Sequence, residues 1–170
     1  MDGCETESVC ECEAVSHSEF GPVVHEESVG RVVRNPMHLN KSGDIKIGLF
    51  PSSHIRQTGL SLLRLDHTTP EEALVLGEKI ANTNDNSLEG LAIAKAETLR
   101  DITVGRIQAL CVVDTPLPEN GDLPAISFHA DALQSIEHPP EDIEEIRNKL
   151  LIAFRKNELM RPEENDSSGQ

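Results

Sequence analysis

Two short apolar segments, residues 45–49 and 60–65, constrain the fold most strongly because they lie close enough in the chain to pair as neighbouring strands. In the first segment, apolar residues alternate with Lys46 and Gly48, the period that places one set of side chains on one sheet face. A polar connection at residues 51–57 joins the two segments. We therefore expect the core to form around this strand pair, and we expect the connecting loop to be a candidate site.

The clearest helix signal lies at residues 66–72. Thr69 can cap a helix, Pro70 suits its first position, and Glu72 completes a capping box. These residues predict a helix over 70–81, whose apolar positions recur every three or four residues. A second helix is predicted over 141–159, where acidic residues at the start and basic residues near the end match the helix dipole.

Four further segments are predicted to contain strands: 29–33, 90–94, 106–113 and 125–129. Pro36 should end the first, and the second should pass into a helical turn. The third is nearly all apolar after Gln108, which is typical of a central strand. This order of strands and helices lacks regular alternation. It favours an α+β fold with a mixed or mostly antiparallel sheet, covered by the 70–81 and 141–159 helices.

The charge is unevenly distributed along the chain. The formal net charge is -15, and residues 1–28 contain eight acidic residues and no Lys or Arg. This composition predicts a disordered or loosely docked N-terminal segment at 1–28, a single domain at 29–160 and a disordered tail at 161–170. The negative charge argues against direct binding to nucleic acid or anionic membranes, and the absence of Trp and Tyr argues against a base-stacking platform.

No apolar segment is long enough to span a membrane, and the N-terminus lacks the pattern of a secretory leader. A cytoplasmic location is therefore expected. Three of the four cysteines lie within the first 12 residues, a spacing unlike the framework of small secreted disulfide proteins.

A candidate zinc site lies in the N-terminal segment. Zinc requires four sulfur or nitrogen ligands, and this segment offers Cys4, Cys10, Cys12 and His17, with His25 nearby. The paired Cys-x-x-Cys spacing of common structural sites is missing. The alternative is an acidic tail with incidental thiols, and no other cofactor is predicted.

Two further sets of residues are candidates for chemistry. Ser52 or Ser53, His54 or His129, and Asp114 supply the residue types of a serine hydrolase, although the Gly-x-Ser-x-Gly elbow is absent and turn or capping roles are the alternative. An anion-binding set could form if basic side chains meet at one sheet edge, and its alternative is pairing with the abundant carboxylates. That set consists of Arg34, His38, Arg56, Arg64 and His129.

Short motifs over residues 30–132 resemble a family of small bacterial proteins of uncharacterised function. They include Val33-Arg34-x-Pro36, Phe50-Pro51-Ser52-Ser53, Gly59-Leu60-Ser61, Gly90-Leu91-Ala92, Leu99-Arg100 and a final strand ending in His129. Where that family tends to have Ala-His, this chain has Phe128-His129. The resemblance implies no activity, but it marks Arg34, Ser53 and His129 as residues of interest.

Acidic composition and missing catalytic signatures favour a non-enzymatic cytoplasmic module that binds a basic protein partner. The first alternative is a small enzyme or ligand-binding domain that recognises an anionic group with Arg34, Ser53 and His129. The second is a zinc-binding N-terminal module.

Overall fold

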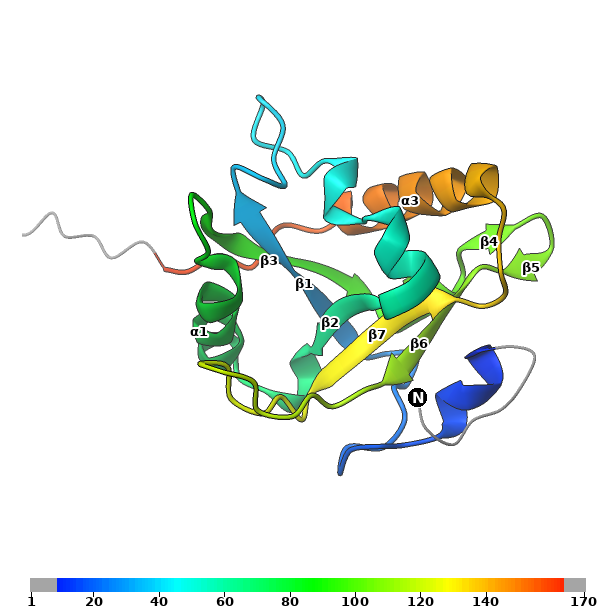
Figure 1. Ribbon diagram of the computed structural model, residues 1–170, viewed down its shortest axis with the longest axis horizontal. Coiled ribbons are helices and arrows are strands. Elements are labelled where there is room, and N and C mark those ends of the chain that lie inside the picture. Colours follow the sequence, from blue (N-terminus) through cyan, green and yellow to red (C-terminus); the bar gives the residue numbers. More distant parts are fainter. Residues whose placement is uncertain (1–8, 164–170) are drawn as a thin grey trace, which may run out of the picture.

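The computed structural model describes residues 9–163 and contains a five-stranded antiparallel sheet with the strand order β3-β1-β2-β7-β6 (Figure 1). The α+β fold and the mostly antiparallel sheet are therefore confirmed. The strands are β1 Ser28–Asn35, β2 Leu60–Arg64, β3 Ser87–Lys95, β6 Leu110–Asp114 and β7 His129–Gln134. A separate two-stranded sheet consists of β4 Thr103–Val104 and β5 Ile107–Gln108.

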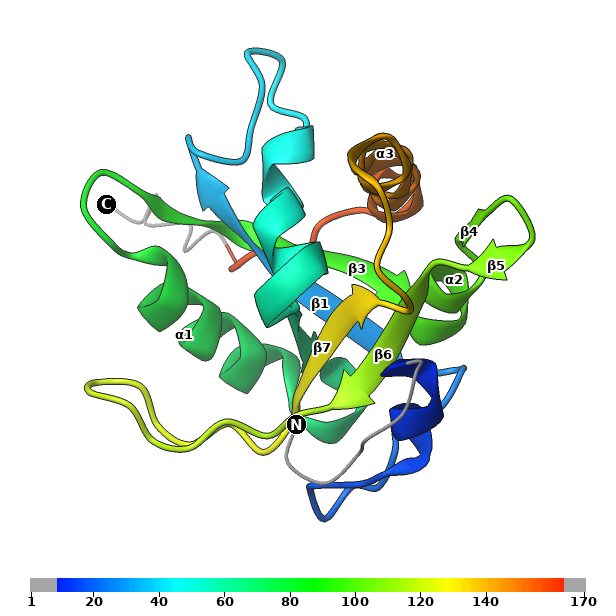
Figure 2. The same cartoon turned by 45° about the vertical axis from the view of Figure 1, so that its right-hand side comes forward.

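The longest helices, α1 Pro70–Ala81 and α3 Pro140–Arg155, lie on opposite sides of the five-stranded sheet (Figure 2). One apolar cluster joins the sheet to Ile143, Ile146, Leu150 and Phe154 of α3, and a second joins it to Ala73 and Leu76 of α1. A short helix, α2 Ala96–Arg100, and several single turns also pack on the sheet, so a covering by two helices alone is not confirmed.

Helix α1 begins as predicted. The Thr69 side chain accepts a hydrogen bond from the Glu72 backbone N–H, and the Glu72 side chain accepts one from the Thr69 N–H. Every part of this signal lies within four consecutive residues, which is why it could be recognised without knowledge of the tertiary structure.

The segment at residues 45–49 does not form the predicted strand. Ile47–Leu49 is instead a 3-10 turn, labelled η2, and β2 pairs with β1 and β7. The consecutive residues Leu49 and Phe50 are both fully buried. A strand would send these two side chains to opposite faces, whereas the turn directs both into one core.

Strand β6 lies at the edge of the sheet, so the prediction of a central strand at 106–113 is wrong. All five of its residues are buried because residues 9–20 pack beside it (Figure 1). The outward backbone N–H of Val112 donates to the Glu13 carboxylate at 2.6 Å, and the Val112 carbonyl accepts from Arg100 at 3.2 Å. The expected loose N-terminal segment is therefore not confirmed for residues 9–28, and residues 1–8 lie outside the described part of the chain.

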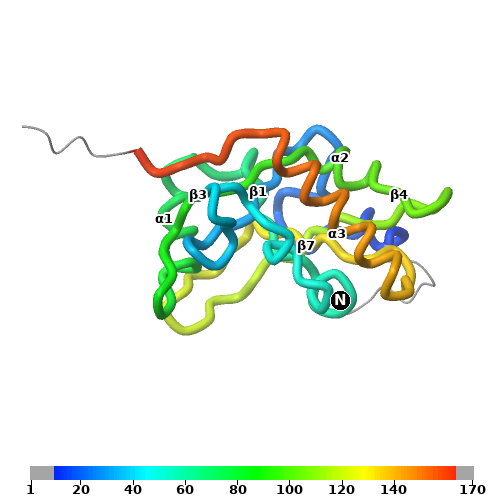
Figure 3. The backbone as a smooth tube through the Cα atoms, turned by 90° about the horizontal axis from the view of Figure 1, so that it is seen from above, coloured from blue at the N-terminus to red at the C-terminus, as the bar shows by residue number. Residues whose placement is uncertain are grey.

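The other outer strand, β3, is also covered. The backbone N–H of Leu91 donates to the Met160 carbonyl at 2.8 Å, and the Met160 N–H donates back at 2.9 Å (Figure 3). A Cβ at Gly90 would lie 2.6 Å from the Met160 carbonyl oxygen, so glycine is required for this close approach. The segment that follows α3 thus forms an isolated bridge with β3 at Leu91.

The last predicted strand, at 125–129, is displaced along the chain. Strand β7 begins at His129, where the predicted strand was expected to end, and Ile126 instead pairs with Leu117 in an isolated bridge. Residues 115–128 form a long connection whose Leu117, Leu123 and Ile126 side chains face the sheet near α1.

Strands β1 and β2 diverge, and this divergence creates a cavity. They pair at Val29–Arg64 and Gly30–Leu63. Beyond these pairs, β1 continues alongside β3 as far as Asn35, while β2 is paired with β7. The space between the two strands opens toward α1 and the 115–128 connection.

Within the described residues, no helix combines the length and apolar character needed to cross a membrane.

Candidate functional site

The cavity between β1 and β2 has a volume of about 260 Å³ and gathers polar groups against an apolar wall. Its polar lining consists of Arg31, Arg34, His38, His54, Ser61 and His129. Its apolar lining comes from the sheet, α1 and the 115–128 connection, and includes Leu63, Ile80, Leu117, Leu123 and Ile126. A small number of polar groups in an apolar concave site is typical of small-molecule binding.

Arg31 fills the point at which the two strands separate. Its Nε donates to the Leu49 carbonyl at 2.8 Å, and its Nη1 donates to the Ser61 carbonyl at 2.9 Å. Burial, with a smaller contribution from Arg34, lowers the pKa of Arg31 to about 10, so the side chain remains charged at neutral pH. Arg31 therefore brings a fixed positive charge to the cavity.

Arg34 and His38 form a second basic unit. The Arg34 backbone N–H donates to Nδ1 of His38 at 3.0 Å, so the proton of the neutral His38 ring lies on Nε2. Burial, followed by the charges of Arg31 and Arg34, lowers the pKa of His38 to about 4. One terminal nitrogen of Arg34 donates to the Ile80 carbonyl at 3.2 Å, but its Nε is buried and has no hydrogen-bond partner among the described residues.

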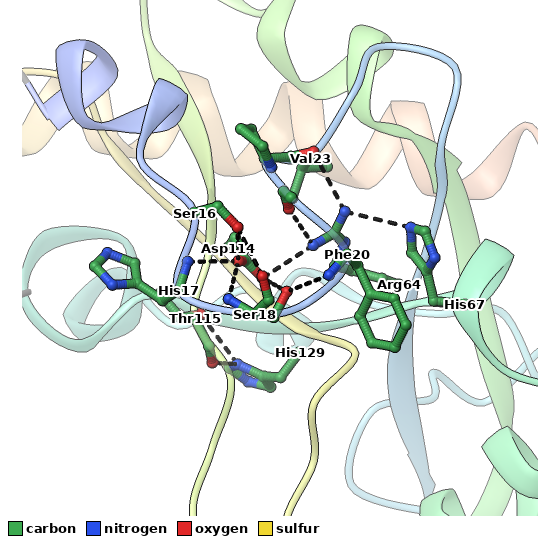
Figure 4. A network of polar contacts seen from close by, with 12 residues as sticks. Ser16, His17, Ser18, Phe20, Val23, Arg64, His67, Asp114, Thr115 and His129 are labelled. Atoms are coloured by element: carbon green, nitrogen blue, oxygen red, sulfur yellow. Dashed lines mark hydrogen bonds and ion pairs between the residues drawn. The ribbon is translucent and has the colours of Figure 1, made fainter.

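His129 enters the cavity from the start of β7 and is 3% exposed. Its Nδ1 lies 2.7 Å from the Thr115 carbonyl oxygen (Figure 4). Its Nε2 is buried and has no hydrogen-bond partner among the described residues. Burial lowers the pKa of His129, although Asp131 acts in the opposite direction.

His54, at the start of a π-helical turn over His54–Thr58, also lines the cavity. Burial and the charges of Arg31 and Arg34 lower its pKa. With the histidines neutral, Arg31 and Arg34 supply the positive charge of the cavity within a chain whose formal net charge is -15.

Arg64 has a different environment from the cavity arginines. It is fully buried and pairs with Glu27 at 2.7 Å and with Asp114 at 2.9 Å. Figure 4 shows Arg64 beside Asp114. Burial acts to raise the pKa of Glu27, but the hydrogen bonds and charge of Arg64 outweigh it and hold that pKa below its usual value. All three nitrogens of the Arg64 guanidinium donate to protein atoms. Arg64 therefore has a structural role, as the carboxylate-pairing alternative anticipated.

Asp114 anchors the N-terminal segment. Its carboxylate accepts hydrogen bonds from the backbone N–H groups of His17 and Ser18, both at 2.8 Å (Figure 4). Burial acts to raise the pKa of Asp114, but these hydrogen bonds and the charge of Arg64 lower it overall. In the sheet Asp114 is opposite Ala130, so its side chain lies on the opposite face from His129.

The structure thus brings together some residues of the predicted anion-binding and serine hydrolase sets, but it does not bring together all residues of either set. Arg34, His38, His54 and His129 line one cavity. Ser53 is exposed and lies outside the lining, and Arg56 is exposed and donates to the His138 carbonyl at 3.2 Å. The serine, histidine and Asp114 arrangement of a hydrolase is therefore not assembled in the described residues.

The cysteines of the candidate zinc site are engaged otherwise. Cys10 forms a disulfide with Cys111 of β6, and Cys12 is also disulfide-bonded. His17 is exposed, and Cys4 lies outside the described residues. Zinc binding stays a prediction, and it would require reduced protein because zinc binds thiolates.

Sequence reasoning missed Arg31 and the Cys10–Cys111 disulfide. Arg31 lies within a β-branched run, where a charged residue is usually assigned to a solvated strand face. The two cysteines are 101 residues apart, and nothing in their spacing indicates pairing.

No protein-family model matches this chain, and neither the curated proteins nor the solved structures with which it was compared gave a match.

Proposed function

We propose that this protein binds a small organic anion in the cavity between β1 and β2. The observation that carries the proposal is the buried Nε of Arg34, a charged donor without a partner among the described residues, in a cavity that also contains Arg31. Buried donors usually have acceptors, and arginine binds carboxylate and phosphate groups with charge-assisted hydrogen bonds.

The size and lining of the cavity support a ligand with an apolar portion. A volume of about 260 Å³ is slightly below the roughly 300–1,000 Å³ typical of small-molecule pockets, so the ligand should be small. Leu117, Leu123 and Ile126 would contact the apolar portion, while the arginines hold the charged group.

Calorimetric titration with isocaproate and with ethyl phosphate tests the proposal. The wild-type protein should bind at least one probe saturably, and Arg34→Gln should weaken that binding about tenfold or more because a charge-assisted hydrogen bond is lost. Arg106→Gln removes an exposed arginine outside the cavity and should leave the affinity unchanged. Absence of saturable binding of either probe at roughly 10 mM would overturn the proposal.

Binding of a basic protein partner is a second candidate function. A groove between α1 and residues 124–128 supports it, because Val75 is 54% exposed there and is flanked by Glu71 and Glu72. Lys79 is the one basic residue among the described residues that line this groove. An apolar anchor on the partner would pack on Val75, and its basic residues would face the carboxylates.

Capture experiments from native lysate, at low and moderate salt, test this second function. A partner that is lost with Val75→Arg, kept with Ile152→Arg on α3 and weakened by salt would support it. Failure to retain any partner, or equal retention by both variants, would contradict it.

A cytoplasmic location is part of both proposals. Disulfides persist mainly in oxidising compartments, so the redox state of Cys10 in cells tests the location directly. Trapping of thiols in intact cells separates the two cases: reduced Cys10 would support a cytoplasmic location, whereas the Cys10–Cys111 disulfide of the structure, if it is present in cells, would place the protein in an oxidising compartment.

A further inference from the structure

We infer that the ligand of this cavity carries a hydrogen-bond donor, such as a hydroxyl group, beside its anionic group, and that Nε2 of His129 accepts from that donor. This inference rests on the proposed anion-binding function and names the class of ligand more narrowly.

The contacts of Nδ1 determine where the proton of His129 lies. Nδ1 is 2.7 Å from the Thr115 carbonyl, which can only accept a hydrogen bond. The Thr115 hydroxyl is 3.1 Å from the same nitrogen, but it donates its proton to the Asp131 carboxylate at 2.8 Å. Nδ1 therefore carries the proton of the neutral ring, and Nε2 presents a lone pair.

The ring is neutral in its surroundings. Burial and the charge of Arg31 disfavour the charged form of the His129 ring, whereas Asp131 and Asp114 favour it. Arg34, His38 and His54 line the same cavity. The net effect lowers the pKa of His129, so Nε2 is an acceptor at neutral pH.

Two buried groups of the cavity lining have no hydrogen-bond partner among the described residues, and they are of opposite kinds: one is a donor and the other is an acceptor. Arg34 Nε–H is a donor without a partner among the described residues, so it suits an anion. Nε2 of His129 is an acceptor, and an ionised carboxylate has no proton to offer it. A simple anion would leave this buried acceptor unpaired, which is unfavourable.

A 2-hydroxycarboxylate, or a phosphate monoester with a neighbouring hydroxyl, meets all of these requirements. Its anionic oxygens accept from Arg34, its hydroxyl donates to His129, and its apolar part contacts Leu117, Leu123 and Ile126. The carboxylate and the phosphate share the same recognition chemistry, and matched probes separate them.

Calorimetric titration of the wild-type protein with three carboxylates of similar shape tests the inference. 2-Hydroxyisocaproate should bind roughly tenfold more tightly than isocaproate, because one further hydrogen bond forms in a buried site. 2-Fluoroisocaproate has a similar size but no donor, and it should bind like isocaproate. The corresponding phosphate pair is 2-hydroxyethyl phosphate and ethyl phosphate, and the pair that binds identifies the anionic group.

Two variants test whether His129 is responsible for the preference for the hydroxylated probe. His129→Leu should bind the hydroxylated and unsubstituted probes equally, while Arg34→Gln should weaken both by the same factor. Thermal unfolding checks that each variant is folded, and the three-probe comparison on the wild-type protein needs no variant.

The outcomes distinguish the inference from the proposed function. Equal binding of the three carboxylates, or of the two phosphates if these are the probes that bind, would overturn the role of His129 and leave the anion site intact. A hydroxyl preference that persists in His129→Leu would also overturn it. Failure of every probe to bind would overturn the anion site itself.

Discussion

Gly59 lies directly before β2 with φ of +86°, and a Cβ there would lie 2.7 Å from Cβ of Asp131. We predict that Gly59→Ala lowers the free energy of unfolding by about 2–4 kcal/mol, because the backbone conformation is unfavourable for alanine and the new methyl group overlaps Asp131. Gly43→Ala is the matched control. Gly43 has φ of +85° but no atom near its potential Cβ, so the cost should be about 1–2 kcal/mol. Equal losses in urea unfolding would contradict the contact with Asp131.

Arg64 provides a second prediction about a single residue. Arg64→Met leaves the buried carboxylates of Glu27 and Asp114 without their cation, and it should lower the free energy of unfolding by about 3–5 kcal/mol. Arg106→Met, at an exposed position, should change it by less than about 0.5 kcal/mol. A similar small effect for both variants would show that the Arg64 pairs contribute little.

Residue types alone indicated part of the candidate site. Arg34, His38 and His129 could be selected as a basic set in an acidic chain, and all three line the cavity. Arg31 could not be selected, because its position depends on where β1 separates from β2. Arg56 and Arg64 are of the same type, but their surroundings give them structural partners.

Among the elements, those encoded by local signals were predictable. The capping box defined α1, and the β-branched run defined β1. Segments whose structure depends on distant partners were not. Residues 47–49 form a turn because Leu49 and Phe50 enter one core, and β6 is buried at the sheet edge because a distant segment covers its outer side.

The N-terminal segment provides the prediction at the scale of an element. The Cys10–Cys111 disulfide closes a loop with a sequence separation of 101, and removing it should destabilise the protein by about 2–5 kcal/mol. The double variant Cys10→Ser with Cys111→Ala tests this by urea unfolding, and wild-type protein in the oxidised state is the reference. Hydrogen exchange should increase at residues 9–24 more than in α3. Unchanged exchange at residues 9–24 would show that the contacts of Asp114 and Arg100 hold the segment without the disulfide.

For the whole molecule, the direction of the pKa shifts predicts sensitivity to acid. The folded state lowers the pKa of His38 to about 4 from 6.5, and it lowers those of Glu27 and Asp114 from 4.5 and 3.8. The unfolded chain therefore binds protons first as the pH falls. Stability should be complete at neutral pH, decline below about 6.5 as the histidines of the unfolded state protonate, and decline further when the carboxylates protonate.

Urea unfolding as a function of pH measures this decline. His38→Gln should reduce the slope between about pH 6.5 and 4, the interval that separates the unfolded and folded pKa values of His38. His17→Gln replaces an exposed histidine and is the matched control. A slope that is the same in all three proteins would contradict the burial of a neutral His38.

The two outer strands of the sheet are each shielded by a segment near one end of the chain: β6 by Glu13, assisted by Arg100, and β3 by Met160. A bare outer strand is a template on which a second copy can add its own strand. Truncation at either end, past Glu13 or before Met160, would therefore convert a self-contained fold into one prone to edge-to-edge association.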